Sequence, residues 1–144
     1  MPRILRNLQL IYDNYRVIPF FLCISVAIDY TLTLYLAGSK EAIRRYEFSP
    51  LLRYVIEHDL VAIYLMFTIF FYYISAYMVL KLIKDEPVYC AGVALILLLS
   101  LTHLLGGLSW VFRKAWYSNT VLTLSLASIA LAIVSFGYVI LRRA

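Results

Sequence analysis

The chain has 144 residues, of which 64% are hydrophobic and only 15% are charged, and its mean hydropathy is +0.86. A soluble domain would not carry repeated apolar runs of about 20 residues, the length that crosses about 30 Å of hydrocarbon. The formal net charge is +5, but the basic residues lie at the ends of these runs and form no stripe with interleaved aromatics. We therefore expect membrane lipids as their partners, and no nucleic acid.

The segment that precedes the first apolar run is amphipathic over residues 3–15. Apolar side chains recur there at helical spacing, with polar side chains between them. The apolar positions are Ile4, Leu5, Leu8, Ile11, Tyr12 and Tyr15. Such a pattern is typical of a helix that lies in the membrane interface.

Four apolar runs follow, at roughly 17–37, 59–80, 88–111 and 119–141. They are continuous rather than alternating, which favours helices over a membrane β-barrel. We predict an all-α polytopic membrane protein in which residues 1–144 form one bundle of four transmembrane helices. The side with both termini carries one more lysine or arginine than the other side, which favours cytoplasmic termini.

The longest connection between the runs covers residues 38–58. Within it, Ser49-Pro50 is typical of an N-cap and the first residue of a helix, and that helix could continue to about Ile83. The last connection is shorter, and Ser118 or Asn119 is the expected N-cap of the fourth span.

Asp29 lies inside the first apolar run, where a carboxylate costs several kcal/mol unless it is paired or faces a polar cavity. It comes nine residues before Gly38, and His103 comes nine residues before Phe112. At about 1.5 Å of rise per residue, both lie roughly 13 Å below the same face of the membrane, which predicts that they pair. Thr33 lies one helical turn above Asp29.

One stretch resembles a prokaryotic family of small four-span membrane proteins of unknown function. That family has an intramembrane Asp followed by Thr, a Gly that ends the helix, and a Glu-x-Asn-Pro motif that opens the next one. The matching residues are Asp29, Thr33, Gly38, Glu47 and Pro50, with Ser49 in place of the Asn. The resemblance implies that Asp29 and Glu47 belong to one site, and that the membrane is the plasma membrane of a prokaryote.

The candidate residues for binding a ligand or ion are therefore Asp29, Thr33, Glu47 and His103. Secondary candidates are His58, Asp59 and Asn119, although the run Glu57-His58-Asp59 also fits a solvated helix edge. The sequence identifies no catalytic group, metal site or cofactor. An Asp–His bond that only holds two helices together is the structural alternative.

Three functions remain open at this point. The leading hypothesis is non-enzymatic binding of an ion, a proton or a lipid-like ligand at the intramembrane polar site, alone or as a subunit of a complex. The second is an intramembrane enzyme for a lipid or isoprenoid substrate, with Asp29 or Glu47 as general base and His103 as its partner. The third is a structural subunit of a homo-oligomer or a larger membrane complex, which the small residues Ser128, Ala132 and Ser135 would suit.

Overall fold

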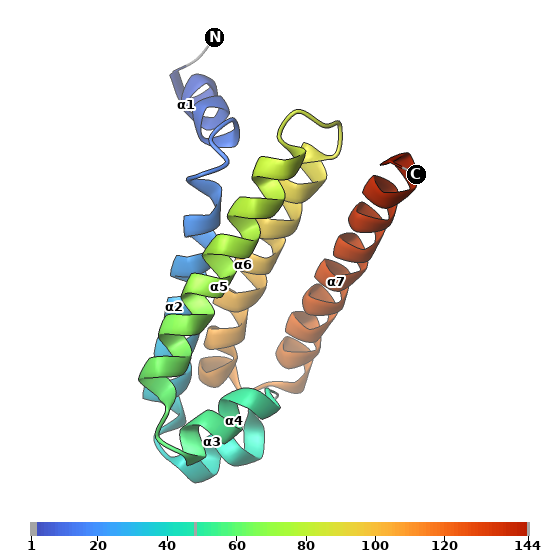
Figure 1. Cartoon of the computed structure of the whole chain (residues 1–144). Helices are drawn as coiled ribbons and strands as arrows, with labels where there is room; N and C mark the ends of the chain where they lie inside the picture. Colours follow the sequence, from blue (N-terminus) through green and yellow to red (C-terminus); the bar gives the residue numbers. More distant parts are fainter. Residues whose placement is uncertain (1–2, 48, 144) are drawn as a thin grey trace.

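The computed structural model describes residues 3–47 and 49–143, and this part of the chain contains seven α-helices and no strand (Figure 1). In chain order the helices are α1 (Arg3–Tyr12), α2 (Ile18–Ala37), α3 (Lys40–Tyr46), α4 (Pro50–Glu57), α5 (Val61–Ile83), α6 (Tyr89–Phe112) and α7 (Ala115–Arg143).

Four of these helices, α2, α5, α6 and α7, are long and apolar enough to cross a membrane. The predicted class, an all-α polytopic membrane protein, is confirmed. Helices α2 and α6 form the central pair; α5 packs against both, and α7 packs mainly along α6. Helix α7 therefore stands to one side of the compact α2–α5–α6 group (Figure 1).

Helix α2 begins and ends at residues with the expected backbone preferences. Pro19 lies in its first turn, where no backbone donor is lost, and Gly38 at its C-terminus has a φ of 72°. The reversal at Gly38 sends the chain into α3 and α4, which lie across the end of the bundle opposite the two termini (Figure 1).

Two glycines let α6 approach α2 closely. A Cβ at Gly107 would lie 2.8 Å from the Cα of Asp29, and a Cβ at Gly106 would lie 3.5 Å from both carboxylate oxygens of Asp29. Small residues at such a crossing allow backbones to come together in a membrane, where van der Waals contact rather than water exclusion holds helices. The crossing therefore positions Asp29 directly against α6.

Two apolar clusters lie on either side of this crossing. The first, nearer the termini, includes Leu22, Val26, Leu80 and Ile96, and the second, nearer α3 and α4, is built from Ala37, Ile43, Leu52, Ile56 and Trp110. Tyr30 packs against both clusters. The polar residues of the crossing are thus enclosed between two apolar layers.

A helix, α1, is present where the sequence predicts an interfacial one, and it ends at Tyr12 rather than at residue 15. The Tyr89 hydroxyl donates a hydrogen bond of 2.7 Å to the Tyr12 carbonyl and so ties α1 to the start of α6. The side chains of residues 3–6 and 8 lie outside the described part, so the stripe predicted for Ile4, Leu5 and Leu8 has no structural description.

Two predictions about the connections are wrong. The helix from Pro50 does not run on to Ile83, because Asp59 has a φ of 56° and ends α4 before α5 begins at Val61. The fourth span begins at Ala115, so Ser118 and Asn119 lie inside α7 rather than capping it.

The segment taken as the longest loop also contains a helix, α3. The Ser39 hydroxyl caps it by accepting a hydrogen bond of 3.1 Å from the Ala42 amide. Glu41 in its first turn and Arg44 in its last turn suit the helix dipole.

We predict that Gly107→Ala destabilises the bundle, because the new methyl group must push α2 away from α6. Overpacking of this kind costs about 1–3 kcal/mol, which exceeds the gain of about 1 kcal/mol that alanine brings to a helix. Gly137→Ala is the matched control, since its Cβ would meet nothing within 4 Å. The free energy of unfolding in mixed micelles should be lower for Gly107→Ala than for the wild type, and equal or higher for Gly137→Ala. Equal free energies for Gly107→Ala and the wild type would contradict the close crossing.

Candidate functional site

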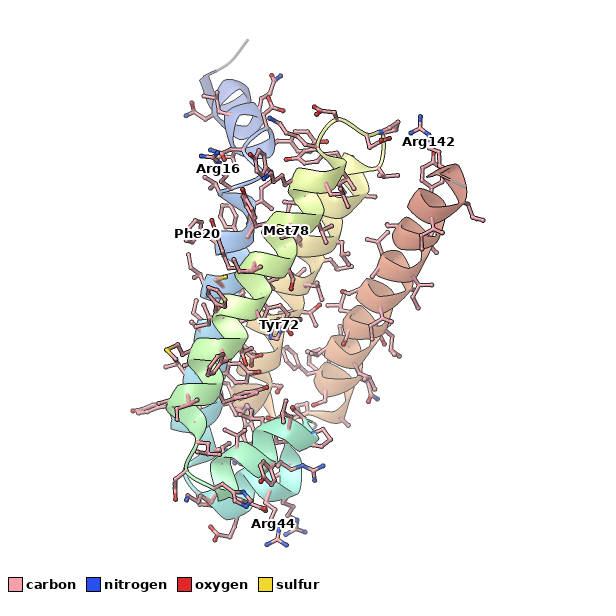
Figure 2. The ribbon with its side chains drawn as sticks, viewed as in Figure 1. Arg16, Phe20, Arg44, Tyr72, Met78 and Arg142 are labelled. Atoms are coloured by element: carbon pink, nitrogen blue, oxygen red, sulfur yellow. The ribbon has the colours of Figure 1, made fainter. Side chains whose placement is uncertain are left out.

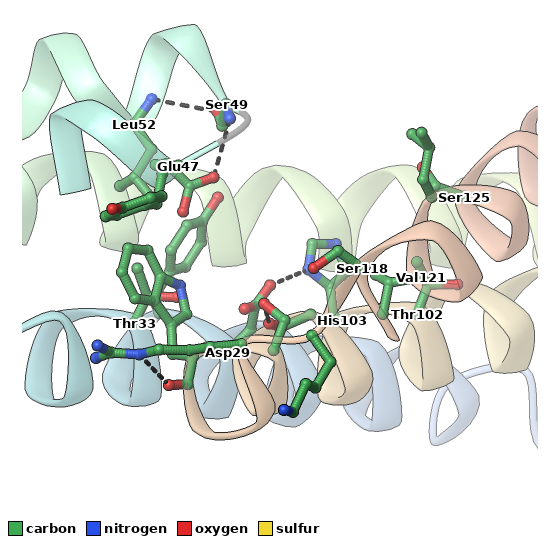
Figure 3. Close-up of a pocket in the computed structure, with 18 of the residues that line it drawn as sticks. Asp29, Thr33, Glu47, Ser49, Leu52, Thr102, His103, Ser118, Val121 and Ser125 are labelled. Atoms are coloured by element: carbon green, nitrogen blue, oxygen red, sulfur yellow. Dashed lines mark hydrogen bonds and ion pairs between the residues drawn. The ribbon is translucent and has the colours of Figure 1, made fainter. Parts of the chain in front are cut away.

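A cavity of about 700 Å³ lies among α2, α4, α5, α6 and the first half of α7 (Figure 3). Ligand pockets commonly measure about 300–1,000 Å³. All four primary candidates predicted from the sequence, Asp29, Thr33, Glu47 and His103, line this cavity.

The Asp29–His103 pair joins α2 to α6 inside the cavity. The Nδ1 of His103 lies 2.8 Å from the Oδ2 of Asp29, so an Nδ1–H donates to the carboxylate. The two side chains are only 18% and 19% exposed. Their contact agrees with the matched depths that the sequence predicts, and it supplies the partner that a carboxylate at this depth requires.

The rest of the His103 ring is positioned by Tyr72 of α5. The two rings meet edge to face, with centroids 5.5 Å apart. The Nε2 of His103 makes no hydrogen bond to any described residue, and no described side-chain polar atom is both buried and without a partner. Nε2 therefore remains accessible, and because His103 lines the cavity it is a hydrogen-bonding position for a ligand.

Hydroxyl groups on the cavity wall fall into two classes. Thr102 and Ser109 donate to carbonyls of their own helix, at 2.8 and 2.6 Å. Thr33, which is only 2% exposed, and Ser118 and Ser125 also line the cavity, and their hydroxyls make no hydrogen bond to another described residue. Thr33 comes from α2, whereas Ser118 and Ser125 come from α7. Hydroxyls that could bond to a ligand therefore lie on opposite walls of the cavity.

The end of the cavity near α3 and α4 carries charged residues of both signs. The Oε1 of Glu47 accepts a hydrogen bond of 2.9 Å from the Ser49 amide, and Ser49 in turn caps α4 by accepting from the Leu52 amide at 3.2 Å (Figure 3). Arg113 and Lys114, in the short connection from α6 to α7, line the same cavity.

Arg113 fixes the geometry of that connection. Its backbone is left-handed, with a φ of 40°, a conformation that non-glycine residues adopt rarely. Its guanidinium donates to the Trp110 carbonyl and to the Leu36 carbonyl, both at 3.0 Å. These bonds join the ends of α6 and α2 at the place where α7 begins.

A tyrosine pair completes the wall between α2 and α5. The hydroxyls of Tyr30 and Tyr64 lie 3.1 Å apart, and both residues line the cavity together with Tyr72. Sequence reasoning did not place these tyrosines or Arg113 at the site. For Tyr30 a signal was available, because it is adjacent to Asp29 in a span.

The secondary candidates do not line the cavity. His58 stacks on Tyr54 and bonds the Tyr54 carbonyl through Nδ1 at 2.8 Å. Asp59 forms an exposed ion pair of 2.6 Å with Lys40. Asn119 is exposed on α7, where its carbonyl accepts from Thr123. These residues serve the local structure of α4, the α4–α5 corner and α7.

Metal-ligand geometry is not found in the part of the chain that the structure describes: no three His, Cys, Asp or Glu side chains gather there. Comparison of the chain with protein-family models, with curated proteins and with solved structures finds no match. The site must therefore be interpreted from its own chemistry.

We predict an energetic coupling of about 1 kcal/mol between Asp29 and His103, the size that hydrogen bonds between membrane helices usually reach. A double-mutant cycle with Asp29→Asn and His103→Gln, measured by unfolding in mixed micelles, gives this value. As a control, Asp29→Asn and Cys90→Ser should be additive, because Cys90 is exposed at the start of α6. Additivity of the Asp29 and His103 variants would show that the pair does not form.

Proposed function

We propose that this membrane protein binds the polar head of a lipid-like ligand in the cavity between α2, α6 and α7. The observation that carries the proposal is the accessible Nε2 of His103, held by Asp29 on the wall of a cavity whose other walls offer unpartnered hydroxyls. A bond that served only to hold helices together would not need an open space beside it.

The composition of the walls favours an amphiphile over a bare ion. Thr33, Ser118 and His103 offer polar contacts, whereas Leu52 and Val121 offer apolar ones. A ligand with a hydrogen-bonding head and an apolar tail would match both. A small ion would leave most of the cavity of about 700 Å³ to water.

Helix α7 supplies a path between this cavity and the bilayer. Leu122 lines the cavity and yet is 52% exposed, so the cavity reaches the outer apolar surface of the bundle. The tail of an amphiphile would leave by this side while its head remained beside His103.

We also propose that the termini face the cytoplasm, so that the cavity lies nearer the outer face of the membrane. The balance of lysine and arginine supports this orientation. The proposed likeness to the four-span prokaryotic family rests on the matching residues of the sequence; Ser49, which stands where that family has Asn, caps α4 with its hydroxyl.

Trp110 provides a direct probe of ligand binding. It lines the cavity and is 9% exposed, whereas Trp116, the only other tryptophan, is 67% exposed. In a Trp116→Phe background in nanodiscs, we predict that a bromine-labelled twelve-carbon amphiphile quenches Trp110 in a saturable manner. The quenching should be measured for three amphiphiles that share this tail and carry a hydroxyl, a carboxylate or a phosphate as the head.

Asp29→Asn should weaken this binding about tenfold or more, because it replaces a charged carboxylate, which only accepts, with a neutral amide that can donate to Nδ1 and change the tautomer of His103; a factor of ten corresponds to about 1.4 kcal/mol. Asp59→Asn is the matched control, since its carboxylate lies outside the cavity. Quenching that rises linearly for all three heads, and equally in Asp29→Asn, would refute the binding site.

One observation favours a second candidate, an intramembrane enzyme that acts on a lipid. A carboxylate that holds Nδ1 of an imidazole and leaves Nε2 toward a ligand is the arrangement of a general base. Ser118 and Ser125 face the same cavity and offer hydroxyls. The chemistry that this arrangement suits is proton abstraction from a hydroxyl or from water during ester hydrolysis or transfer.

If the protein is such an enzyme, purified protein incubated with a lipid extract should form a product detectable by mass spectrometry, and His103→Gln should reduce its rate by about 100-fold or more. His58→Gln is the control, because that ring stacks on Tyr54 outside the cavity. Absence of any product, together with saturable quenching of Trp110, would leave the binding function alone.

A further inference from the structure

At the end of the bundle opposite the cavity, three cations surround two contacting tyrosines. The rings of Tyr15 and Tyr77 lie 5.6 Å apart. Arg16 and Lys84 lie 5.8 and 5.2 Å from the centre of the Tyr15 ring, and Lys81 lies 5.8 Å from that of Tyr77. Figure 2 shows Arg16 at the same end as Arg142, with Arg44 at the other end.

These three cations have no carboxylate partner among the described residues. The acidic residue Glu86, which follows Lys84 closely, is paired instead with Arg142 at 2.8 Å. At the α3–α4 end, by contrast, Lys40 and Arg44 pair with Asp59 and Glu57. Asp13 and Asp85 line a hollow together with Lys84 but form no ion pair with it, so none of the three cations is neutralised by a direct carboxylate contact within the described part of the chain.

A second observation is that the three positive charges all affect the hydroxyl of Tyr15. The Arg16 guanidinium beside the Tyr15 hydroxyl, with Lys81 and Lys84 nearby, lowers the pKa of Tyr15. Three like charges around two rings repel one another, and an anion placed between them would relieve this repulsion.

An aromatic row leads from this cluster toward the apolar middle of the bundle. Tyr77 stacks on Tyr73 with centroids 6.2 Å apart, and Tyr73 contacts Phe20 at 4.8 Å. Phe20 and Met78 are exposed on the outer face of α2 and α5 (Figure 2). A basic cluster at the ends of two spans, continuous with an apolar outer face, matches the head and tail of a lipid.

We propose that Arg16, Lys81 and Lys84 bind the phosphate of an anionic glycerophospholipid, with one acyl chain along Tyr77, Tyr73 and Phe20. This site is separate from the cavity of Asp29 and His103. Because it lies where α2 begins and α5 ends, it also places the bound headgroup in the interface on the side of the termini.

The test compares two triple variants that remove the same charge. Arg16→Gln/Lys81→Gln/Lys84→Gln should weaken binding of dioleoyl phosphatidylglycerol about tenfold or more by native mass spectrometry, because the phosphate would lose the three charges that attract it. Lys40→Gln/Arg44→Gln/Arg45→Gln should leave it unchanged. Equal weakening by both triples would overturn the proposal, since it would indicate only diffuse attraction.

Two further measurements keep the proposal testable. Inorganic phosphate at millimolar concentration should not displace the lipid; if it does, the site binds phosphate and not a lipid. Should the triple variant fail to fold, wild-type protein in nanodiscs replaces it. Phosphatidylglycerol should then slow the reaction of Lys84 with an amine reagent several-fold relative to phosphatidylcholine, with Lys40, which lies outside both proposed sites, as the reference. Equal rates would refute the site.

Discussion

The hydrogen bond between Asp29 and His103 is the interaction on which the rest of the structure depends. A carboxylate in the apolar part of a membrane is costly without a partner, and here that partner is an imidazole on the neighbouring helix at 2.8 Å. The bond is possible because Gly107 lets α6 lie against the backbone of α2. A Cβ at Gly107 would lie 2.8 Å from the Asp29 Cα and force the two helices apart, whereas one at Gly106 would meet the carboxylate at 3.5 Å, an ordinary contact; Gly107 and the polar pair therefore form one structural unit.

The cavity beside this pair arises from how α7 is held. Arg113 joins the end of α6 to the end of α2, and the Tyr117 hydroxyl donates to the Leu105 carbonyl at 3.0 Å. Both bonds act on the connection and the first turn of α7. Farther along, Ser128 is buried on the side of α7 that packs along α6. Helix α7 is therefore fixed to α6 but does not close over α2 and α5, and its hydroxyls face His103 across an open space.

Much of the fold follows from the sequence because the bilayer imposes simple rules. Continuous apolar runs must form helices, and residues at equal distances from the helix ends lie at equal depth, which is why Asp29 and His103 could be paired in advance. The turns between the helices are determined by local backbone conformation rather than by the bilayer. The left-handed backbone of Asp59 and of Arg113 is stabilised by contacts that no pattern of apolar residues reveals, so the break before α5 and the early start of α7 were not predicted.

The tyrosines show a second limit of the sequence. Aromatic residues are frequent in this chain, and composition alone gives no reason to choose one over another. Tyr30, Tyr64 and Tyr72 acquire a role only because the packing of α5 against α2 and α6 turns them toward the same space. Helix α3, in contrast, could have been predicted from the sequence. Ser39 is a typical N-cap, and Glu41 and Arg44 place charges that suit the two ends of a helix.

The measurement that tests this account most directly is nitrogen-15 NMR of the two histidine side chains, His58 and His103, in nanodiscs, with His58→Gln to assign them. We expect that Nδ1 of His103 carries the proton bonded to Asp29 and that Asp29→Asn shifts the Nδ1 signal. A bound amphiphile should shift the Nε2 signal while the Nδ1 bond persists. An Nδ1 signal that is unchanged in Asp29→Asn would contradict the pairing of Asp29 with His103. An Nε2 signal that no amphiphile changes would contradict ligand binding beside His103.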